Sequence, residues 1–148
     1  MAAGVTIEVA EAPSQDDRAA ILRGLVAFND AAYGPSNIEP LAVLLRDEAG
    51  DVVGGLWGRT TYGWLYVELL FVPETLRGQG VGGLVIAEAE KVAHGRACVN
   101  AWVDCFGEAN RRFYEGRGFA VFGSIPDQPP GSERFFLKKA LRLNAPSA

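Results

Sequence analysis

The sequence predicts an α/β fold in which helices flank a mixed, mostly antiparallel sheet of about six or seven strands. The chain has 148 residues, of which 49% are apolar, so it can form one hydrophobic core. Three apolar runs joined by short turns precede a glycine-rich segment, after which helix and strand patterns alternate. The predicted order is strand–helix, three strands, helix–strand, helix–two strands. We expect one domain over residues 1–143 and a frayed tail over 144–148.

The N-terminal part is predicted to contain a strand and a helix. Residues 5–9 alternate between apolar and polar types as in a short strand. Ser14 and Asp17 have the spacing of a capping box, in which each side chain bonds the backbone N–H of the other residue. Apolar residues then recur at helical spacing, which predicts a helix over about 15–31.

Three consecutive strands are predicted next, as an antiparallel meander. Gly50, which stands among acidic residues, and the Tyr62–Gly63 pair are typical of tight turns between strands. The apolar runs around these turns predict strands over 42–45, 52–60 and 64–72.

Helix and strand patterns alternate in the second half of the chain. The glycine-rich loop runs directly into a segment from Val81 whose apolar residues share one helical face. Residues 97–103 are β-branched or aromatic in a run too short for a helix, so they predict a buried strand. The last predicted elements are a helix over 108–117 and a hairpin over 119–122 and 134–138.

Charge and hydropathy argue against several classes of partner. The chain has 14 basic and 18 acidic residues, a net charge of −4 and a pI near 5.0, which argue against nucleic acid. The longest apolar run, Trp64–Val72, is far shorter than the roughly 20 residues of a membrane helix, so no membrane partner is expected. Because no basic residue precedes Arg18, the N-terminus fits neither a secretory nor a transit signal, and we expect a cytoplasmic protein.

The metal-ligating residue types are sparse. His94 is the only histidine, which excludes a site built from several histidines. Cys98 and Cys105 are seven positions apart, a spacing that matches no metal or redox motif. We therefore expect reduced thiols and no metal.

A glycine-rich loop before a helix predicts an anion site, because it exposes backbone N–H groups where the helix N-terminus carries partial positive charge. Arg77, Gly80 and Gly82 form the pattern R-x-x-G-x-G, and the later phrase FYEGRGF spans 113–119. Together with the order of elements, these motifs resemble the GNAT superfamily of N-acetyltransferases. The resemblance covers nearly the whole chain.

The resemblance implies an enzyme that moves an acetyl group from acetyl-coenzyme A (acetyl-CoA), its cosubstrate, to a primary amine of a small molecule or peptide. Transfer would be direct, in a ternary complex and without a metal. In similar proteins the pantetheine arm lies along the strand before the loop, where two parallel strands separate, and the loop holds the pyrophosphate. The implied cofactor-binding residues are Leu70, Phe71, Val72, Arg77, Gly78, Gln79, Gly80, Val81, Gly82, Gly83, Asn110 and Tyr114, with the N–H near Leu70 polarising the thioester carbonyl.

The catalytic candidates are two carboxylates and a phenol. Glu68 stands in an apolar strand, where burial would raise its pKa towards that of a useful general base. Asp104, at the end of the next strand, is the second candidate, and for both a plain surface or turn role stays open. Tyr114 occupies the tyrosine of the family phrase and is implied as general acid. Many relatives carry an asparagine where this chain has Gly107, and the sequence does not show whether Asn110 replaces it.

Three alternatives stay open at this point. Gly78, Gly80 and Gly83 also satisfy the dinucleotide fingerprint G-x-G-x-x-G, with Asp104 near the position of a ribose-binding acid. The glycines could instead serve only close helix packing. A non-catalytic acyl-CoA-binding or regulatory module on the same fold is the rival to an enzyme.

The acceptor is not identified by the sequence. Similar proteins also often pair through terminal strands, so the apolar run 135–137 could contribute to a homodimer. By the same resemblance, the acceptor cleft would be bordered by Tyr33, Trp57, Trp102, Phe106 and the segment 126–133.

Overall fold

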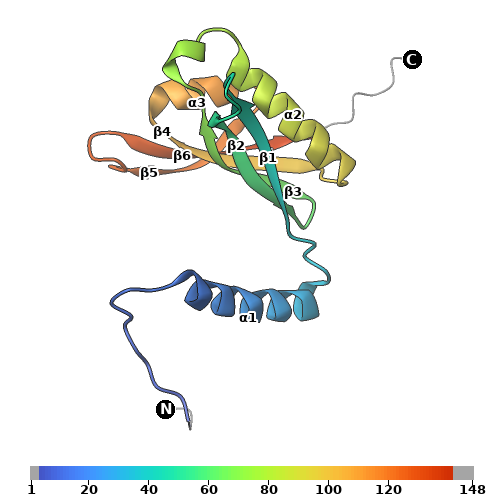
Figure 1. Cartoon of the computed structure of the whole chain (residues 1–148), viewed down its shortest axis with the longest axis vertical. Helices are drawn as coiled ribbons and strands as arrows, with labels where there is room; N and C mark the ends of the chain where they lie inside the picture. Colours follow the sequence, from blue (N-terminus) through green and yellow to red (C-terminus); the bar gives the residue numbers. More distant parts are fainter. Residues whose placement is uncertain (1–3, 142–148) are drawn as a thin grey trace. The chain divides into compact units, whose positions relative to one another are not determined.

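The computed structural model describes residues 4–141, which form three α-helices, one 3-10 turn and a six-stranded sheet. The chain divides between Ser36 and Asn37 into two compact units, of which the first contains α1 and the second contains the sheet (Figure 1). The elements are α1 (Gln15–Tyr33), β1 (Glu39–Arg46), β2 (Val52–Thr61), β3 (Trp64–Phe71), η1 (Glu74–Leu76), α2 (Val81–Gly95), β4 (Asn100–Phe106), α3 (Gly107–Glu115), β5 (Ala120–Pro126) and β6 (Glu133–Ala140).

The first unit contains the predicted helix but not the predicted strand. The capping box is present, because the backbone N–H of Ser14 donates to Asp17 Oδ2 at 2.9 Å and that of Asp17 donates to Ser14 Oγ at 3.1 Å. The prediction of a strand over 5–9 is wrong, since this segment has no strand conformation and joins no ladder within residues 4–141. Alternation is a local property, whereas a strand also needs a pairing partner.

The second unit is a mixed sheet in the order β1-β2-β3-β4-β6-β5. Only the β3–β4 pair is parallel, so the predicted mixed and mostly antiparallel sheet is confirmed, with six strands. Helices α2 and α3 lie on the same side of this sheet (Figure 1). The core between the helices and the sheet includes Leu56, Leu65, Val67, Val85, Ile86, Ala89, Val103 and Leu137.

Element boundaries shift most around β4. The predicted strand 97–103 begins at Asn100 and continues to Phe106. Ala97, with φ 63°, makes the turn after α2 and donates its N–H to the carbonyl of His94 at 2.9 Å. The shift brings Asp104 inside a strand and next to the sheet centre.

Two further predictions concern the chain as a whole. The single domain over 1–143 stays a prediction, and the tail 144–148 lies outside the described residues. None of the helices in the described part of the chain is both long and apolar enough to cross a membrane.

Candidate active site

The parallel strands β3 and β4 separate towards their carboxyl ends. Their ladder joins Trp64–Val67 to Asn100–Val103, although β3 continues to Phe71 and β4 to Phe106. Beyond Val67, β3 pairs only with β2, so its other edge borders a cavity of about 300 Å³. This smaller cavity is lined by Val67, Glu68, Leu69, Leu70, Val103, Asp104, Cys105, Phe106, Asn110 and Tyr114.

A β-bulge sets the position of Glu68. The β2–β3 register shifts between Trp57 and Gly58, which leaves Glu68 as the extra residue of β3. Gly58 allows this close approach, because a Cβ there would lie 2.2 Å from the carbonyl oxygen of Tyr66. The bulge therefore depends on a residue without a side chain on the neighbouring strand.

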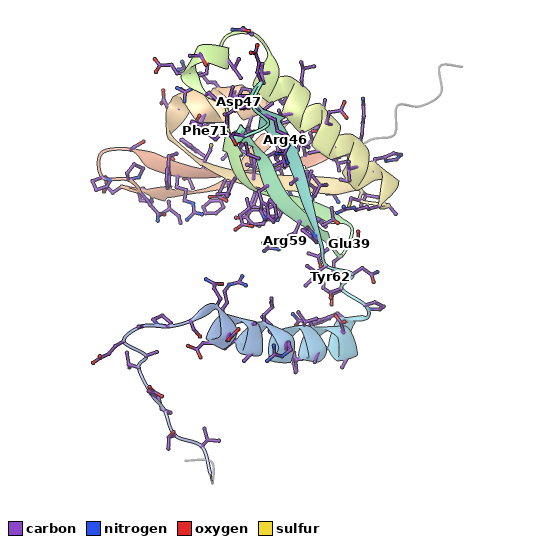
Figure 2. The ribbon with its side chains drawn as sticks, viewed as in Figure 1. Glu39, Arg46, Asp47, Arg59, Tyr62 and Phe71 are labelled. Atoms are coloured by element: carbon purple, nitrogen blue, oxygen red, sulfur yellow. The ribbon has the colours of Figure 1, made fainter. Side chains whose placement is uncertain are left out.

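Glu68 is not buried as the sequence suggested. Its side chain is 44% exposed, and Oε2 lies 3.6 Å from Nη1 of Arg59. The guanidinium carbon of Arg59, which is labelled in Figure 2, also lies 4.7 Å from the centre of the Tyr66 ring, so the Arg59 side chain is close to both Glu68 and Tyr66. The expectation that Glu68 is buried within the strand is therefore wrong in the second unit, where it is the extra residue of a bulge and its side chain lies at the surface of the sheet.

Asp104 is held much more firmly than Glu68. Its Oδ2 accepts hydrogen bonds from Nε and Nη2 of Arg134, at 2.9 and 2.5 Å, and the Tyr66 hydroxyl donates to Oδ1 at 3.3 Å. Burial, followed by the negative charge of Asp104, raises the pKa of Tyr66, whose ring stacks on Trp102 at 4.0 Å. Arg134 reaches this site through the β4–β6 register, which no sequence signal predicts.

Tyr114 lies at the junction of two cavities. Its side chain is only 6% exposed and meets the rings of Phe113 and Phe119 edge-on. Burial raises the pKa of the Tyr114 phenol well above its usual range, and the nearby Cys105 and Asp104 raise it further. The phenol therefore stays protonated at any ordinary pH and is available as a donor.

The second cavity is larger, about 640 Å³, and follows the glycine-rich loop. Two arginines and no acidic residue stand on its wall, whereas two carboxylates and no basic residue stand on the wall of the smaller cavity. Its lining residues are Leu70, Phe71, Val72, Leu76, Arg77, Gly78, Gly80, Val81, Gly82, Gly83, Asn110, Phe113, Tyr114 and Arg117.

The loop backbone is shaped for an anion. Gly78 and Gly80 have φ values of 76° and 78°, the left-handed region that favours glycine. Gly80 is the N-cap of α2, where no side chain caps the helix and no acidic residue stands in the first turn. The first N–H groups of the helix thus have no intrahelical acceptor, which is the arrangement that binds phosphate in other proteins.

The structure places most of the predicted cofactor-binding residues around these cavities. Arg77 donates from Nε to the carbonyl of Val72 at 2.9 Å, which fixes it at the rim of the larger cavity. Asn110 lines both cavities, and its amide nitrogen donates to the carbonyl of Phe106 at 2.7 Å. Gln79 lines neither cavity, because its side chain bonds the carbonyl of Thr75 at 3.1 Å.

The acceptor-side residues are placed only in part. Trp57 is 48% exposed on β2, and Phe106 lines the smaller cavity. The loop predicted over 126–133 shortens to 127–132, because β5 and β6 extend to Pro126 and Glu133. Tyr33 belongs to the first unit, at the end of α1.

Neither a metal site nor a dinucleotide fold emerges from the geometry. No group of three His, Cys, Asp or Glu side chains in residues 4–141 could hold a metal ion, and both cysteines are free thiols. The strands before the loop form an antiparallel meander, and η1 intervenes before the glycines. A dinucleotide fingerprint requires the tight turn directly after a strand of a parallel βαβ unit.

Comparison with known proteins decides the family. The acetyltransferase (GNAT) family matches residues 10–119, which is most of the chain. The chain belongs to this family. It is 40% identical over 135 residues to acetyltransferase Atu2258 of Agrobacterium fabrum, covering 91% of this chain and 96% of that protein. It is also 35% identical over 127 residues to the blasticidin-S acetyltransferase of Streptomyces morookaense, covering 85% and 92%.

Solved structures agree with this assignment. A provisionally assigned acetyltransferase from Agrobacterium tumefaciens is 37% identical and matches with a TM-score of 0.86, covering 92% of this chain and 99% of that chain. An aminoglycoside 6′-N-acetyltransferase complexed with coenzyme A shares the fold at 17% identity, with a TM-score of 0.62 and coverage of 71% and 74%. This GNAT protein is therefore an N-acetyltransferase with the GNAT fold.

Proposed function

We propose that this GNAT enzyme transfers an acetyl group from acetyl-CoA directly to a primary amine of a small molecule or peptide, in a ternary complex. The observation that carries the proposal is the pair of adjoining cavities with opposite charge. They share Leu70, Asn110 and Tyr114 as walls. An anionic nucleotide fits the cationic side and a protonated amine fits the acidic side, so the reacting groups meet at the shared wall.

The residues present fit acetyl-CoA. The uncapped N-terminus of α2 and the left-handed glycines suit a pyrophosphate, and the edge of β3 that β4 leaves unpaired suits the amides of a pantetheine arm. The bound thioester would supply an acetyl group already activated for attack. The backbone N–H near Leu70 would then polarise the acetyl carbonyl.

Glu68 is the better supported proton acceptor of the two carboxylates. Its charge is only loosely balanced by Arg59 at 3.6 Å, and its half-exposed oxygens can bond an incoming ammonium group. Asp104 already accepts hydrogen bonds from Arg134 and Tyr66. We therefore propose that Glu68 accepts the proton of the amine, directly or through water. The role of Asp104 would be to orient the Tyr66 hydroxyl.

Tyr114 is the proposed proton donor. Its raised pKa keeps the phenol protonated, and Tyr114 lines both of the cavities in which the reactants would bind. A protonated phenol can supply a hydrogen bond or a proton to a departing thiolate. Because the same shift disfavours a tyrosinate, the phenol would either hydrogen-bond the sulfur or regain its proton from the amine nitrogen, which loses one as the amide forms.

The acceptor class is proposed from charge and from one relative. Glu68, the loosely paired carboxylate of the smaller cavity, favours an acceptor that arrives as a cation, and a relative 35% identical is named for blasticidin-S. We therefore place small cationic amines first and peptide amino termini second. A homodimer and a cytoplasmic location stay predictions that light scattering and cell fractionation can test.

The test is a panel of amines incubated with acetyl-CoA and the whole chain, in which released thiol and acetylated product are both measured. We expect saturable acetyl-CoA binding and turnover of at least one cationic amine. Binding without turnover across aminoglycosides, blasticidin-S, polyamines and peptides would favour the non-catalytic module. A chain that binds no acetyl-CoA would overturn the proposal altogether.

A further inference from the structure

Arg117 is a cation on the wall of the larger cavity that has no acidic partner among residues 4–141. It follows α3, and its Nε is buried without a hydrogen-bond partner. Arg111 also has an unpartnered buried Nε, but its Nη1 lies 3.1 Å from Glu115. Arg117 therefore differs from Arg111 because no carboxylate of the described chain lies beside its guanidinium.

The guanidinium of Arg117 rests against the first turn of α2. A Cβ added to Gly83 would lie 2.7 Å from its Nε and 2.8 Å from its Nη2, so the guanidinium occupies the space that a side chain at this position would take. The plane is also supported by the Phe113 ring, whose centre is 5.0 Å from the guanidinium carbon. These contacts with Gly83 and Phe113 hold the guanidinium at the wall of the cavity.

This position is electrostatically unfavourable in the absence of an anion. The N-terminus of a helix carries partial positive charge, and a neighbouring cation is repelled by it. The first turn of α2 contains no acidic residue that could offset the repulsion, and neither does the wall of the larger cavity. Two positive features thus face one cavity, which is an arrangement that a bound anion would stabilise.

We propose that Arg117 binds a phosphate group of the nucleotide thioester, alongside the backbone N–H groups of the glycine-rich loop. A guanidinium presents its N–H donors in a planar fork that matches phosphate oxygens, and a side chain already held by packing loses little freedom on binding. The inference rests on the proposed function, because it names a further residue of the same cofactor site. The phosphate is either in the pyrophosphate or on the ribose 3′ position, and both present the same chemistry.

The test compares the affinities of coenzyme A, 3′-dephospho-coenzyme A and pantetheine by titration calorimetry of the whole chain. The variants are Arg117→Gln, Arg117→Lys and the control Arg112→Gln. Arg112 lies on α3, five positions before Arg117, its side chain is 71% exposed, and it pairs with Glu108 outside the cavity. Thermal unfolding of each free variant checks that the fold is intact.

We expect Arg117→Gln to weaken coenzyme A binding by about 10- to 100-fold, as for the loss of a charge-assisted hydrogen bond. Arg117→Lys should weaken it by less, because it keeps the charge but loses the fork. Pantetheine binding to both variants and all binding to Arg112→Gln should match the wild type. If 3′-dephospho-coenzyme A is unaffected by Arg117→Gln, the 3′-phosphate is the partner, whereas an equal loss for both nucleotides assigns the pyrophosphate.

Several outcomes contradict the inference. Equal affinity of the wild type and both Arg117 variants for coenzyme A would show that Arg117 only packs on Phe113. An equal loss for pantetheine would show a general distortion of the cavity. If Arg117→Gln does not fold, the affinities of Arg117→Lys for the three ligands still test the inference. Unchanged affinity of Arg117→Lys for coenzyme A would then contradict it. A wild type that binds none of them would overturn the proposed function as well, whereas normal wild-type binding with unaffected variants overturns this inference alone.

Discussion

The two cavities are built by different parts of the chain. The larger one is formed by a loop, a helix terminus and arginines, so its affinity for an anion comes mainly from backbone geometry and positive charge. The smaller one is formed by the separating edges of β3 and β4, and its carboxylates come from single side chains. Ligand binding in the larger cavity should therefore depend more on backbone shape and net charge than on individual side chains. The chemistry of the smaller cavity should depend most on single polar atoms.

The largest effect is expected from a negative charge placed in the larger cavity. Gly80→Asp adds a carboxylate at a residue with φ 78° and open space around it. Because adjacent like charges cost several kcal/mol, we expect a loss of acetyl-CoA affinity of about 100-fold or more. Titration calorimetry measures this loss, and the thermal shift produced by acetyl-CoA should largely disappear.

Gly80→Asn is the matched control for that variant. Asparagine has nearly the same shape as aspartate and tolerates positive φ better than most residues. We expect it to retain most of the affinity. Equal losses in the two variants would show that backbone strain, and not charge, decides binding in the larger cavity.

The next effect tests the wall that both cavities share. Tyr114→Phe removes one hydroxyl and keeps the ring contacts with Phe113 and Phe119. We expect kcat to fall by about 100-fold, as for the loss of a general acid, with acetyl-CoA affinity nearly unchanged. Steady-state kinetics measure kcat and calorimetry measures the affinity. Wild-type turnover in this variant would show that Tyr114 only packs in the core.

A third prediction separates the two carboxylates of the smaller cavity. Glu68→Gln should lower kcat by about 10-fold or more at neutral pH, because the proposed proton acceptor is lost. Asp104→Asn should instead lower the free energy of unfolding by about 1–3 kcal/mol, because it weakens the bonds of a part-buried carboxylate with Arg134. Kinetics and urea unfolding of both variants distinguish the roles, and a larger kcat loss in Asp104→Asn would reverse our assignment.

The smallest effect concerns Cys105, whose thiol reports how strongly the smaller cavity disfavours an anion. Burial, followed by the negative charge of Asp104, raises the pKa of this thiol from 9.0 to about 11. In a Cys98→Ala background, alkylation by iodoacetamide should therefore reach its half-maximal rate near pH 11 in the folded chain and near pH 9 in urea. A folded midpoint near 9 would show that the cavity does not disfavour an anion at this position.

The sign of the accompanying stability change follows from the same shift. The folded state holds the Cys105 proton more tightly than the unfolded state, so the unfolded chain ionises first. The contribution of the neutral thiol to stability is complete below about pH 9 and is lost as the pH rises through about 11. Replacement of Cys105 by alanine should reduce the loss of stability across this range.

The cofactor side of the site was largely predictable from the sequence. Consecutive residues from Leu70 to Gly83 carry most of that site, and their loop conformation depends on local glycine chemistry. Arg117 could also have been noticed, because it stands inside the FYEGRGF phrase, but its contact with Gly83 could not. The acidic side was less predictable, since the burial expected for Glu68 was wrong and Arg134 was missed.

The sequence by itself determined the elements whose signals are local. These include the capping box at Ser14, the turn at Tyr62 and the helix that starts after Gly80. The tertiary structure alone decided that residues 5–9 form no strand, that a bulge opposite Gly58 exposes Glu68, and that Arg134 neutralises Asp104. Strand pairing joins residues far apart in the chain, and its register depends on packing and hydrogen bonding across the whole sheet.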